Sequence, residues 1–66
     1  MYIKTNNSTY IVDERKNTFS GPVTNGVPRE IYLMGTCIVG LPFEVYVKDN
    51  EKVTRIRTSP VVYAHV

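Results

Sequence analysis

Apolar and polar residues alternate along most of this chain, in short runs that Asn, Asp, Gly and Pro interrupt. Valine, isoleucine, threonine and tyrosine dominate the runs, and no window holds a sustained helical period. Such alternation between turn residues predicts β-strands with one buried face. The chain is therefore expected to be all-β, a small curled antiparallel meander or barrel of about five to six short strands.

The first hairpin is predicted at Tyr2–Thr5 and Thr9–Asp13, around a turn at Asn6-Asn7 or Asn7-Ser8. Asparagine tolerates the left-handed backbone conformation that tight hairpin turns require. Either turn puts the same residues on the expected core face, namely Met1, Ile3, Tyr10 and Val12.

The next segments are predicted to be a turn at residues 14–17, with Asn17 left-handed, and a short strand at Thr18–Ser20. Gly21 to Pro28 contains Gly-Pro and Asn-Gly pairs and is expected to form an exposed loop or a loose minor hairpin. Arg29 to Val39 is the longest apolar run and predicts one long strand.

This long strand is expected to bulge or bend at Gly35 and to turn back at Gly40-Leu41, with glycine in the first central position. The predicted cross-strand pairs are Ile38 with Phe43, Thr36 with Val45 and Met34 with Val47.

Opposite charges indicate a register for the hairpin between Phe43 and Arg57. A turn at Asp49-Asn50 pairs Lys48 with Glu51 and Glu44 with Arg55, and such pairs stabilise a sheet. One face then carries Met34, Ile38, Phe43, Val45, Val47 and Ile56. The other carries Leu33, Cys37, Tyr46 and Val53, ringed by Glu44, Lys48, Arg55 and Arg57. The run is expected to stop at Thr58-Ser59-Pro60, before a final strand at Val61–Val66 that lies in a barrel seam or pairs with another chain.

Sixty-six residues allow one domain, residues 1–66. A domain of this size buries only ~60% of the surface of its unfolded chain, so an oligomeric partner is an expected source of further stability. Cys37 is the single cysteine and excludes an internal disulfide. It and His65 are the only soft metal ligands, so neither a metal site nor a cofactor site is predicted.

The net charge of +2 comes from interspersed basic and acidic residues rather than from a basic tract. No apolar run approaches the ~20 residues of a membrane span, and the first residues lack the order of a signal peptide. A cytoplasmic location is therefore expected.

Two segments carry a resemblance, namely residues 2–13, which contain Thr5-Asn6-Asn7-Ser8, and residues 57–62, which contain Thr58-Ser59-Pro60-Val61. They resemble the two ends of small uncharacterised proteins encoded by actinobacterial phages, over about a quarter of the chain. The resemblance implies a phage-encoded protein in the cytoplasm of an infected bacterium. It brings no activity and no functional residues with it.

No catalytic group is predicted. His65 is expected to be an ordinary strand residue, although Ser59 or Asp13 near it would change that interpretation. Cys37 is expected to pack as a small hydrophobe, unless Arg55 or Lys48 makes its thiol reactive. An enzyme is the least favoured class, because so small a core leaves little room for a substrate pocket.

The favoured function is protein binding, to a host protein or to a second copy of the chain. The predicted contact surface is Leu33, Tyr46, Val53, Arg55 and Arg57, because an apolar centre with a charged rim is typical of interfaces. One alternative is weak binding of single-stranded nucleic acid by the same tyrosine and arginines, and another is a structural or decorating role in the virion.

Overall fold

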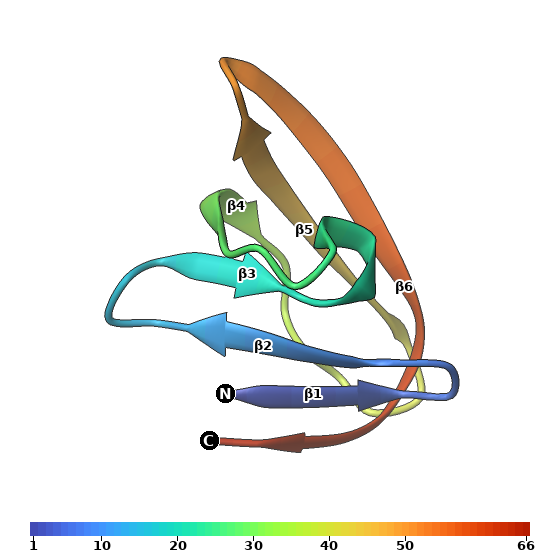
Figure 1. Ribbon diagram of the computed structural model, residues 1–66. Helices are drawn as coiled ribbons and strands as arrows, with labels where there is room; N and C mark the ends of the chain where they lie inside the picture. The colour runs from blue at the N-terminus through green and yellow to red at the C-terminus, as the bar shows by residue number, and fades with distance from the viewer.

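Six strands follow one another around a closed antiparallel barrel in the computed structural model, which describes residues 1–66 (Figure 1). Each strand pairs with the next, and the last returns to pair with the first. This confirms the predicted all-β barrel. The strands are β1 (Tyr2–Thr5), β2 (Thr9–Asp13), β3 (Thr18–Ser20), β4 (Arg29–Met34), β5 (Pro42–Asp49) and β6 (Lys52–His65), and a 3-10 turn, η1 (Pro22–Thr24), follows β3.

Nine buried apolar residues fill the barrel, and three aromatic rings lie at their centre. The Phe19 ring stacks on Tyr10 at 5.3 Å and on Phe43 at 6.3 Å between ring centroids. The complete set is Ile3, Tyr10, Val12, Phe19, Ile31, Phe43, Val45, Val47 and Val61. The predicted core face of the first hairpin is confirmed, since Ile3, Tyr10 and Val12 are buried and Met1 packs against them.

The turn between β1 and β2 is stabilised by a side chain rather than by a left-handed asparagine. Tyr2 lies opposite Ile11, so the turn falls at Asn6-Asn7, yet neither asparagine has a positive φ. Instead, Oγ1 of buried Thr5 accepts hydrogen bonds from the backbone N–H groups of Asn7 and Ser8. Threonine hydroxyls close turns in this way, which removes the need for a left-handed residue.

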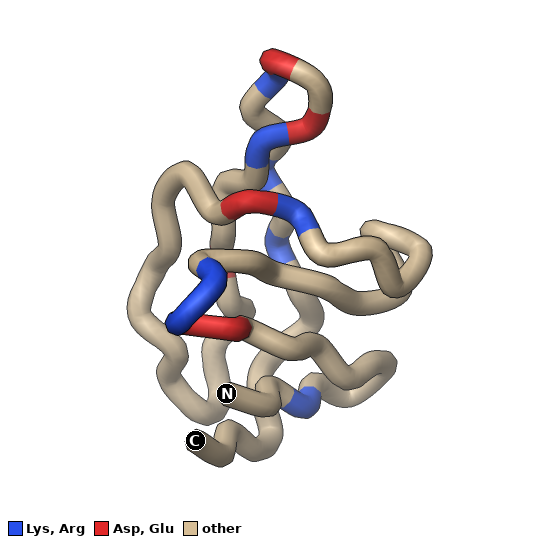
Figure 2. The backbone as a smooth tube through the Cα atoms, turned by 60° about the vertical axis from the view of Figure 1, so that its left-hand side comes forward, with Lys and Arg blue, Asp and Glu red and all other residues tan.

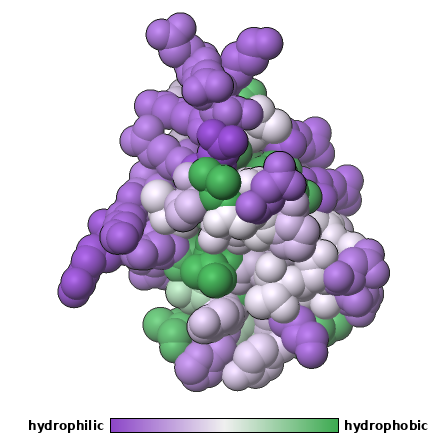
Figure 3. Space-filling model, viewed as in Figure 1, coloured by the Kyte–Doolittle hydropathy of each residue, from purple (hydrophilic) through white to green (hydrophobic).

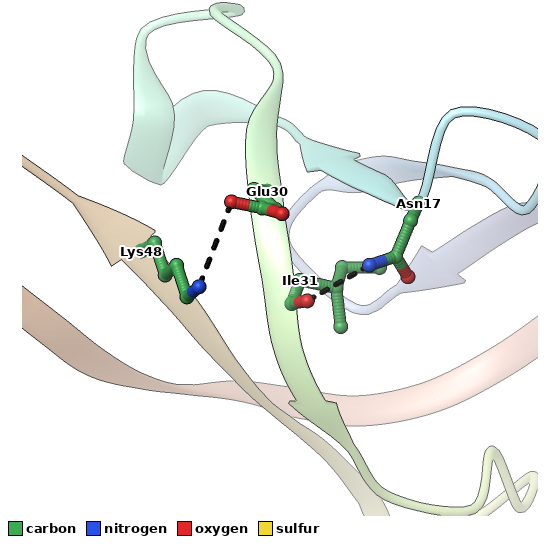
Figure 4. A network of polar contacts seen from close by, with 4 residues as sticks. All are labelled: Asn17, Glu30, Ile31 and Lys48. Atoms are coloured by element: carbon green, nitrogen blue, oxygen red, sulfur yellow. Dashed lines mark hydrogen bonds and ion pairs between the residues drawn. The ribbon is translucent and has the colours of Figure 1, made fainter.

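Asn17 has the predicted left-handed conformation, at φ 56°, and it connects the β2–β3 turn to β4 (Figure 4). Its backbone carbonyl accepts from the N–H of Ile31 at 2.8 Å, and its Nδ2 donates to the carbonyl of Ile31 at 2.9 Å. Asn17 thus provides hydrogen-bond partners for both the N–H and the carbonyl of Ile31. β3 begins only at Thr18 and does not extend to this position.

The predicted long strand from Arg29 to Val39 is wrong in its second half. β4 ends at Met34, and the segment from Gly35 to Ile38 has no strand structure. Gly40 lies in the turn as expected, with a positive φ of 96°, but the turn closes by a hydrogen bond from Leu41 N–H to the Ile38 carbonyl. Gly40 therefore occupies the second central position of the turn.

Three predicted pairs are replaced as a result. Met34 lies opposite Val45 instead of Val47, and Ile31 lies opposite Val47. Ile38 and Met34 were expected in the core but are 48% and 39% exposed. Cys37 was placed on the face opposite Met34 and Ile38, yet it is Cys37 that packs against the core, in agreement with its expected role as a small hydrophobe. Once the chain leaves the sheet at Gly35, strand alternation no longer determines which side chains face inward.

The β5–β6 hairpin turns at Asn50-Glu51, one residue later than predicted. Asp49 lies opposite Lys52 and Tyr46 opposite Arg55, and both turn residues are left-handed, at φ 51° and 70°. The change moves each pair by two positions, so the face of each side chain is preserved. Phe43, Val45 and Val47 are buried as predicted.

A single substitution in this turn is expected to stabilise the protein. Glu51 has a Cβ in a left-handed conformation, which costs about 1–2 kcal/mol relative to an allowed conformation. Replacing it by glycine creates Asn-Gly, the pair that suits a two-residue hairpin best. We expect Glu51→Gly to raise the free energy of unfolding by about 1 kcal/mol in urea titrations.

The matched control is Glu14→Gly, in a turn residue whose φ is not positive. There glycine adds only flexibility to the unfolded chain, so stability should stay the same or fall. Equal effects of the two substitutions would contradict the backbone explanation.

β6 is one strand of 14 residues rather than two. Its first part pairs with β5, and its last part, from Val61, pairs with β1 and closes the barrel. Pro60 was expected to interrupt the strand, but it lies within β6 opposite Pro42. Neither proline has an N–H, so the ladder lacks hydrogen-bond donors at this pair. The strand nevertheless continues through Pro60.

Candidate functional site

Residues from three neighbouring strands form a row across the outer side of the barrel. Leu33 of β4 lies directly opposite Tyr46 of β5, which lies opposite Arg55 of β6. Val53 and Arg57 occupy the next outward positions on β6, two residues to either side of Arg55. The structure therefore brings together all five residues of the predicted contact surface. We call these five residues the outer face.

The outer face combines exposed apolar side chains with a paired charge. Leu33 is 59% exposed and Val53 is 48% exposed, while Tyr46 between them is half-buried. Arg55 holds Glu44 through two contacts, Nε to Oε1 at 3.3 Å and Nη2 to Oε2 at 3.4 Å. This ion pair was predicted as a directly opposite pair, but in the observed register it runs diagonally, since Glu44 lies opposite Arg57.

A bulge in β4 places Leu33 on the outside. Ile31 and Leu33 are two residues apart and would share a face in a regular strand. The register shifts between them, however, and Ile31 is buried while Leu33 is exposed. Bulges of this kind redirect a side chain and bend the strand.

Tyr32, which the sequence did not single out, is exposed beside Leu33. Tyr32 is 60% exposed, and the Nζ of Lys48 lies 6.0 Å from the centroid of its ring. Lys48 was expected to pair with Glu51 but lies 3.9 Å from Glu30 instead (Figure 4). No local sequence signal marks Tyr32, because its exposure depends on how β4 pairs with β5.

Charged residues are unevenly distributed over the molecule, and the tip of the β5–β6 hairpin carries one group of them. Figure 2 shows most of them at the tip of the β5–β6 hairpin, along the start of β4 and in the β2–β3 turn. Lys4 is the one charged residue of β1. The segments 31–43 and 58–66 contain no Asp, Glu, Lys or Arg. In Figure 3, hydrophilic atoms cover the hairpin tip, whereas hydrophilic, neutral and hydrophobic atoms are mixed over the lower part of the molecule. The outer face lies beside this charged hairpin tip.

The other residues considered for chemistry have structural partners. The His65 ring stacks on Tyr63, at 6.2 Å between centroids. Ser59 Oγ accepts from Asn7 Nδ2 at 2.7 Å, and Asp13 Oδ1 accepts from the Lys16 N–H at 3.1 Å. These contacts do not bring Ser59 or Asp13 to His65.

Cys37 is half-buried against the core, as its packing interpretation predicts. Burial raises the pKa of its thiol above the ordinary value. Since the thiolate is the reactive form, this environment lowers thiol reactivity at neutral pH.

No family model, curated protein or solved structure matches this chain. The structure has no helix of the length and apolar character needed to span a membrane. No three His, Cys, Asp or Glu side chains gather as metal ligands would.

Proposed function

We propose that this chain is a protein-binding module that docks through the outer face, onto a host protein or a second copy of itself. The observation that carries the proposal is the exposure of Leu33 and Val53 around Tyr46, beside the Glu44–Arg55 ion pair. Interfaces commonly place apolar and aromatic residues at the centre and charges at the rim.

The barrel core makes no use of these exposed side chains. Phe19, Phe43, Val45 and Ile3 are fully buried without any contribution from Leu33 or Val53. Single exposed apolar residues are normal on protein surfaces, but a contiguous group beside an ordered ion pair supports an interaction site. The five residues of the outer face are contiguous across β4, β5 and β6.

Substituting Leu33→Asp is expected to weaken binding about tenfold or more. The carboxylate would have to lose its water in a contact that now removes an apolar side chain from water. The test is affinity capture from an extract of the native host, together with the solution mass of the purified protein across a range of concentrations. Loss of a captured protein, or loss of a dimer, should accompany the substitution.

Val39→Asp provides the matched control, since Val39 is 63% exposed but lies outside the outer face, in the β4–β5 connection. Both variants should keep the far-ultraviolet circular dichroism and melting temperature of the parent. If Leu33→Asp and Val39→Asp reduce binding equally, the outer face has no special role.

Single-stranded nucleic acid is a second candidate partner because Tyr32 and Lys48 place an exposed aromatic ring beside a cation. Small barrels bind single strands by stacking bases on such rings. A gel-shift series at rising salt separates the two candidates, since nucleic-acid affinity falls steeply with salt. Absence of a shift at low salt would remove this candidate.

The proposed place of action is the cytoplasm of an infected bacterium. The resemblance of residues 2–13 and 57–62 to phage proteins supports this location. It makes extracts of an actinobacterial host the first source for the capture experiment.

A further inference from the structure

The first part of β6 has a strand neighbour on one side only. Residues 52–57 pair with β5, whereas the pairing of β6 with β1 begins at Val61. The barrel is therefore closed near the termini, but the protruding hairpin has an unpaired edge. We call residues 52–57 the open edge of β6.

The alternation of hydrogen bonds identifies the unpaired groups. A two-residue turn is closed by a hydrogen-bonded pair, here Asp49 and Lys52, so the later bonded residues on β6 are Thr54 and Ile56. The N–H and C=O groups of Val53, Arg55 and Arg57 then point away from β5. No turn, loop or side-chain hydrogen bond reaches these groups. Unpaired strand edges of this kind accept an additional strand.

A groove of about 480 Å³ lies along the open edge. It is lined by residues 54–57 of β6, by Val23, Thr24 and Asn25 around η1, and by Arg29, Val47 and Asp49. Figure 1 shows η1 beside the middle of β6. Successive strand residues point to opposite faces, so four consecutive lining residues mean that the groove meets β6 at its edge. The volume is in the range of ordinary ligand pockets.

We propose that this groove binds an extended, acidic peptide segment of a partner protein, which pairs with the open edge as an additional strand. The inference rests on the proposed protein-binding function and names the form of the partner. Main-chain hydrogen bonds to Val53, Arg55 and Arg57 would provide the attachment, as in other cases of strand addition. The partner's side chains would then alternate between the groove and the outer face.

The lining residues determine which side chains fit. Inward side chains of the added strand meet Val47, Ile56 and Val23, which favours apolar residues there. Outward side chains lie beside Arg55 and Arg57. The lining holds three arginines and one aspartate, and this aspartate is paired with Arg29 at 3.2 Å. Arg55 is paired with Glu44, which does not line the groove, so Arg57 is the lining arginine without an ion pair. Alternating acidic and apolar residues therefore complement the groove best.

Two other occupants fit less well. A second copy adding its own open edge in antiparallel register would place Arg55 opposite Arg55, and directly opposed like charges destabilise a sheet. Positive charges on an edge are indeed a common protection against self-pairing. A nucleic acid strand would need rings to stack on, but no aromatic residue lines the groove.

The test uses a capped peptide of alternating glutamate and valine, about eight residues long, which is enough to span the open edge at ~3.3 Å per residue. In the free protein, the amides of Val53, Arg55 and Arg57 should exchange with solvent faster than those of Thr54 and Ile56. Adding the peptide should protect the first three by about tenfold or more. A lysine–valine peptide of the same length should give less protection.

The matched variants are Arg55→Pro and Arg55→Ala. Both remove the guanidinium, but only proline removes the N–H, and it does so on the side away from β5, where a strand tolerates it. Binding to Arg55→Pro should be about tenfold weaker than binding to Arg55→Ala. If the proline variant fails to fold, the exchange measurement on the unaltered chain decides the question.

Unchanged exchange at Val53, Arg55 and Arg57 with the peptide in excess would overturn the inference. So would stronger protection by an oligothymidylate than by the peptide, or protection that rises with protein concentration alone. The Val39→Asp variant should still bind the peptide, since Val39 belongs neither to the groove lining nor to the outer face. If Leu33→Asp abolishes capture of a partner while the unaltered chain does not bind the peptide, the outer-face proposal stands and this one fails.

Discussion

Replacing Phe19 by alanine should remove about half of the free energy that keeps this barrel folded. Phe19 is completely buried, and its ring is the middle one of three, between Tyr10 and Phe43. Truncating a buried phenylalanine costs about 3–5 kcal/mol, because the lost burial is compounded by an unfilled cavity. A domain of 66 residues has a total stability of only ~3–10 kcal/mol.

The cavity left by Phe19 would be difficult to fill. Its neighbours belong to β2 and β5, whose backbones are held in the closed ladder, so they cannot move inward independently. Urea titration followed by tyrosine circular dichroism measures the effect, since the chain has five tyrosines and no tryptophan. We expect the urea concentration at the midpoint of unfolding to fall to about half of the original value or lower.

Tyr32→Ala is the control for removing an aromatic ring from the same protein. Tyr32 is 60% exposed, so its truncation should change stability by less than about 0.5 kcal/mol. If Phe19→Ala costs no more than Tyr32→Ala, the three-ring stack is not the centre of the core.

Strand alternation predicted the faces of this barrel better than it predicted the partners of each residue. Phe43, Val45 and Val47 are buried as expected, although the turn falls at Asn50-Glu51 instead of Asp49-Asn50. A turn moved by one residue shifts every pair by two, and strand side chains repeat every two residues. Burial therefore constrains the face strongly but cannot distinguish these two registers.

Opposite charges predicted the wrong register, because two charged side chains can form an ion pair across a diagonal of the sheet as well as between directly opposite positions. Glu44 and Arg55 do form an ion pair, but across a diagonal. Long side chains span that distance, so an ion pair seen in the sequence is compatible with more than one alignment.

The parts that the sequence did not reveal depend on contacts between distant segments. The bulge that exposes Leu33 as well as Tyr32 beside it results from the pairing of β4 with β5. The continuity of β6 through Pro60 depends on Pro42, which lies opposite and also lacks an N–H. Neither arrangement has a signal within a few neighbouring residues.

The same distinction applies to the candidate sites. The five outer-face residues were predicted from alternation within one hairpin and its neighbour, and the structure places them together. The groove was not predicted, because it lies between η1 and β6, some 30 residues apart in sequence. The 3-10 turn also gives order to part of the segment expected to be a loop, where Thr24 is buried and its hydroxyl donates to the Gly21 carbonyl.

Replacing Thr58 by valine is expected to destabilise the barrel by about 1–3 kcal/mol. Thr58 is buried where β6 passes from β5 toward β1, and its Oγ1 accepts from the Phe43 N–H at 3.0 Å. The register shifts between Pro42 and Glu44, so this hydroxyl takes the place of a backbone carbonyl for Phe43. Valine has nearly the same shape but leaves that buried N–H without an acceptor.

Thr58→Ser separates the hydrogen bond from the packing. Serine keeps the hydroxyl, including its donation to the Ser59 carbonyl at 2.7 Å, and loses only a methyl group. Serine should therefore cost less than valine in urea titrations, even though valine preserves more apolar volume. If Thr58→Ser cost more stability than Thr58→Val, packing at this corner would hold the two halves of β6 in the closed barrel, and the hydrogen bond from the Phe43 N–H would not.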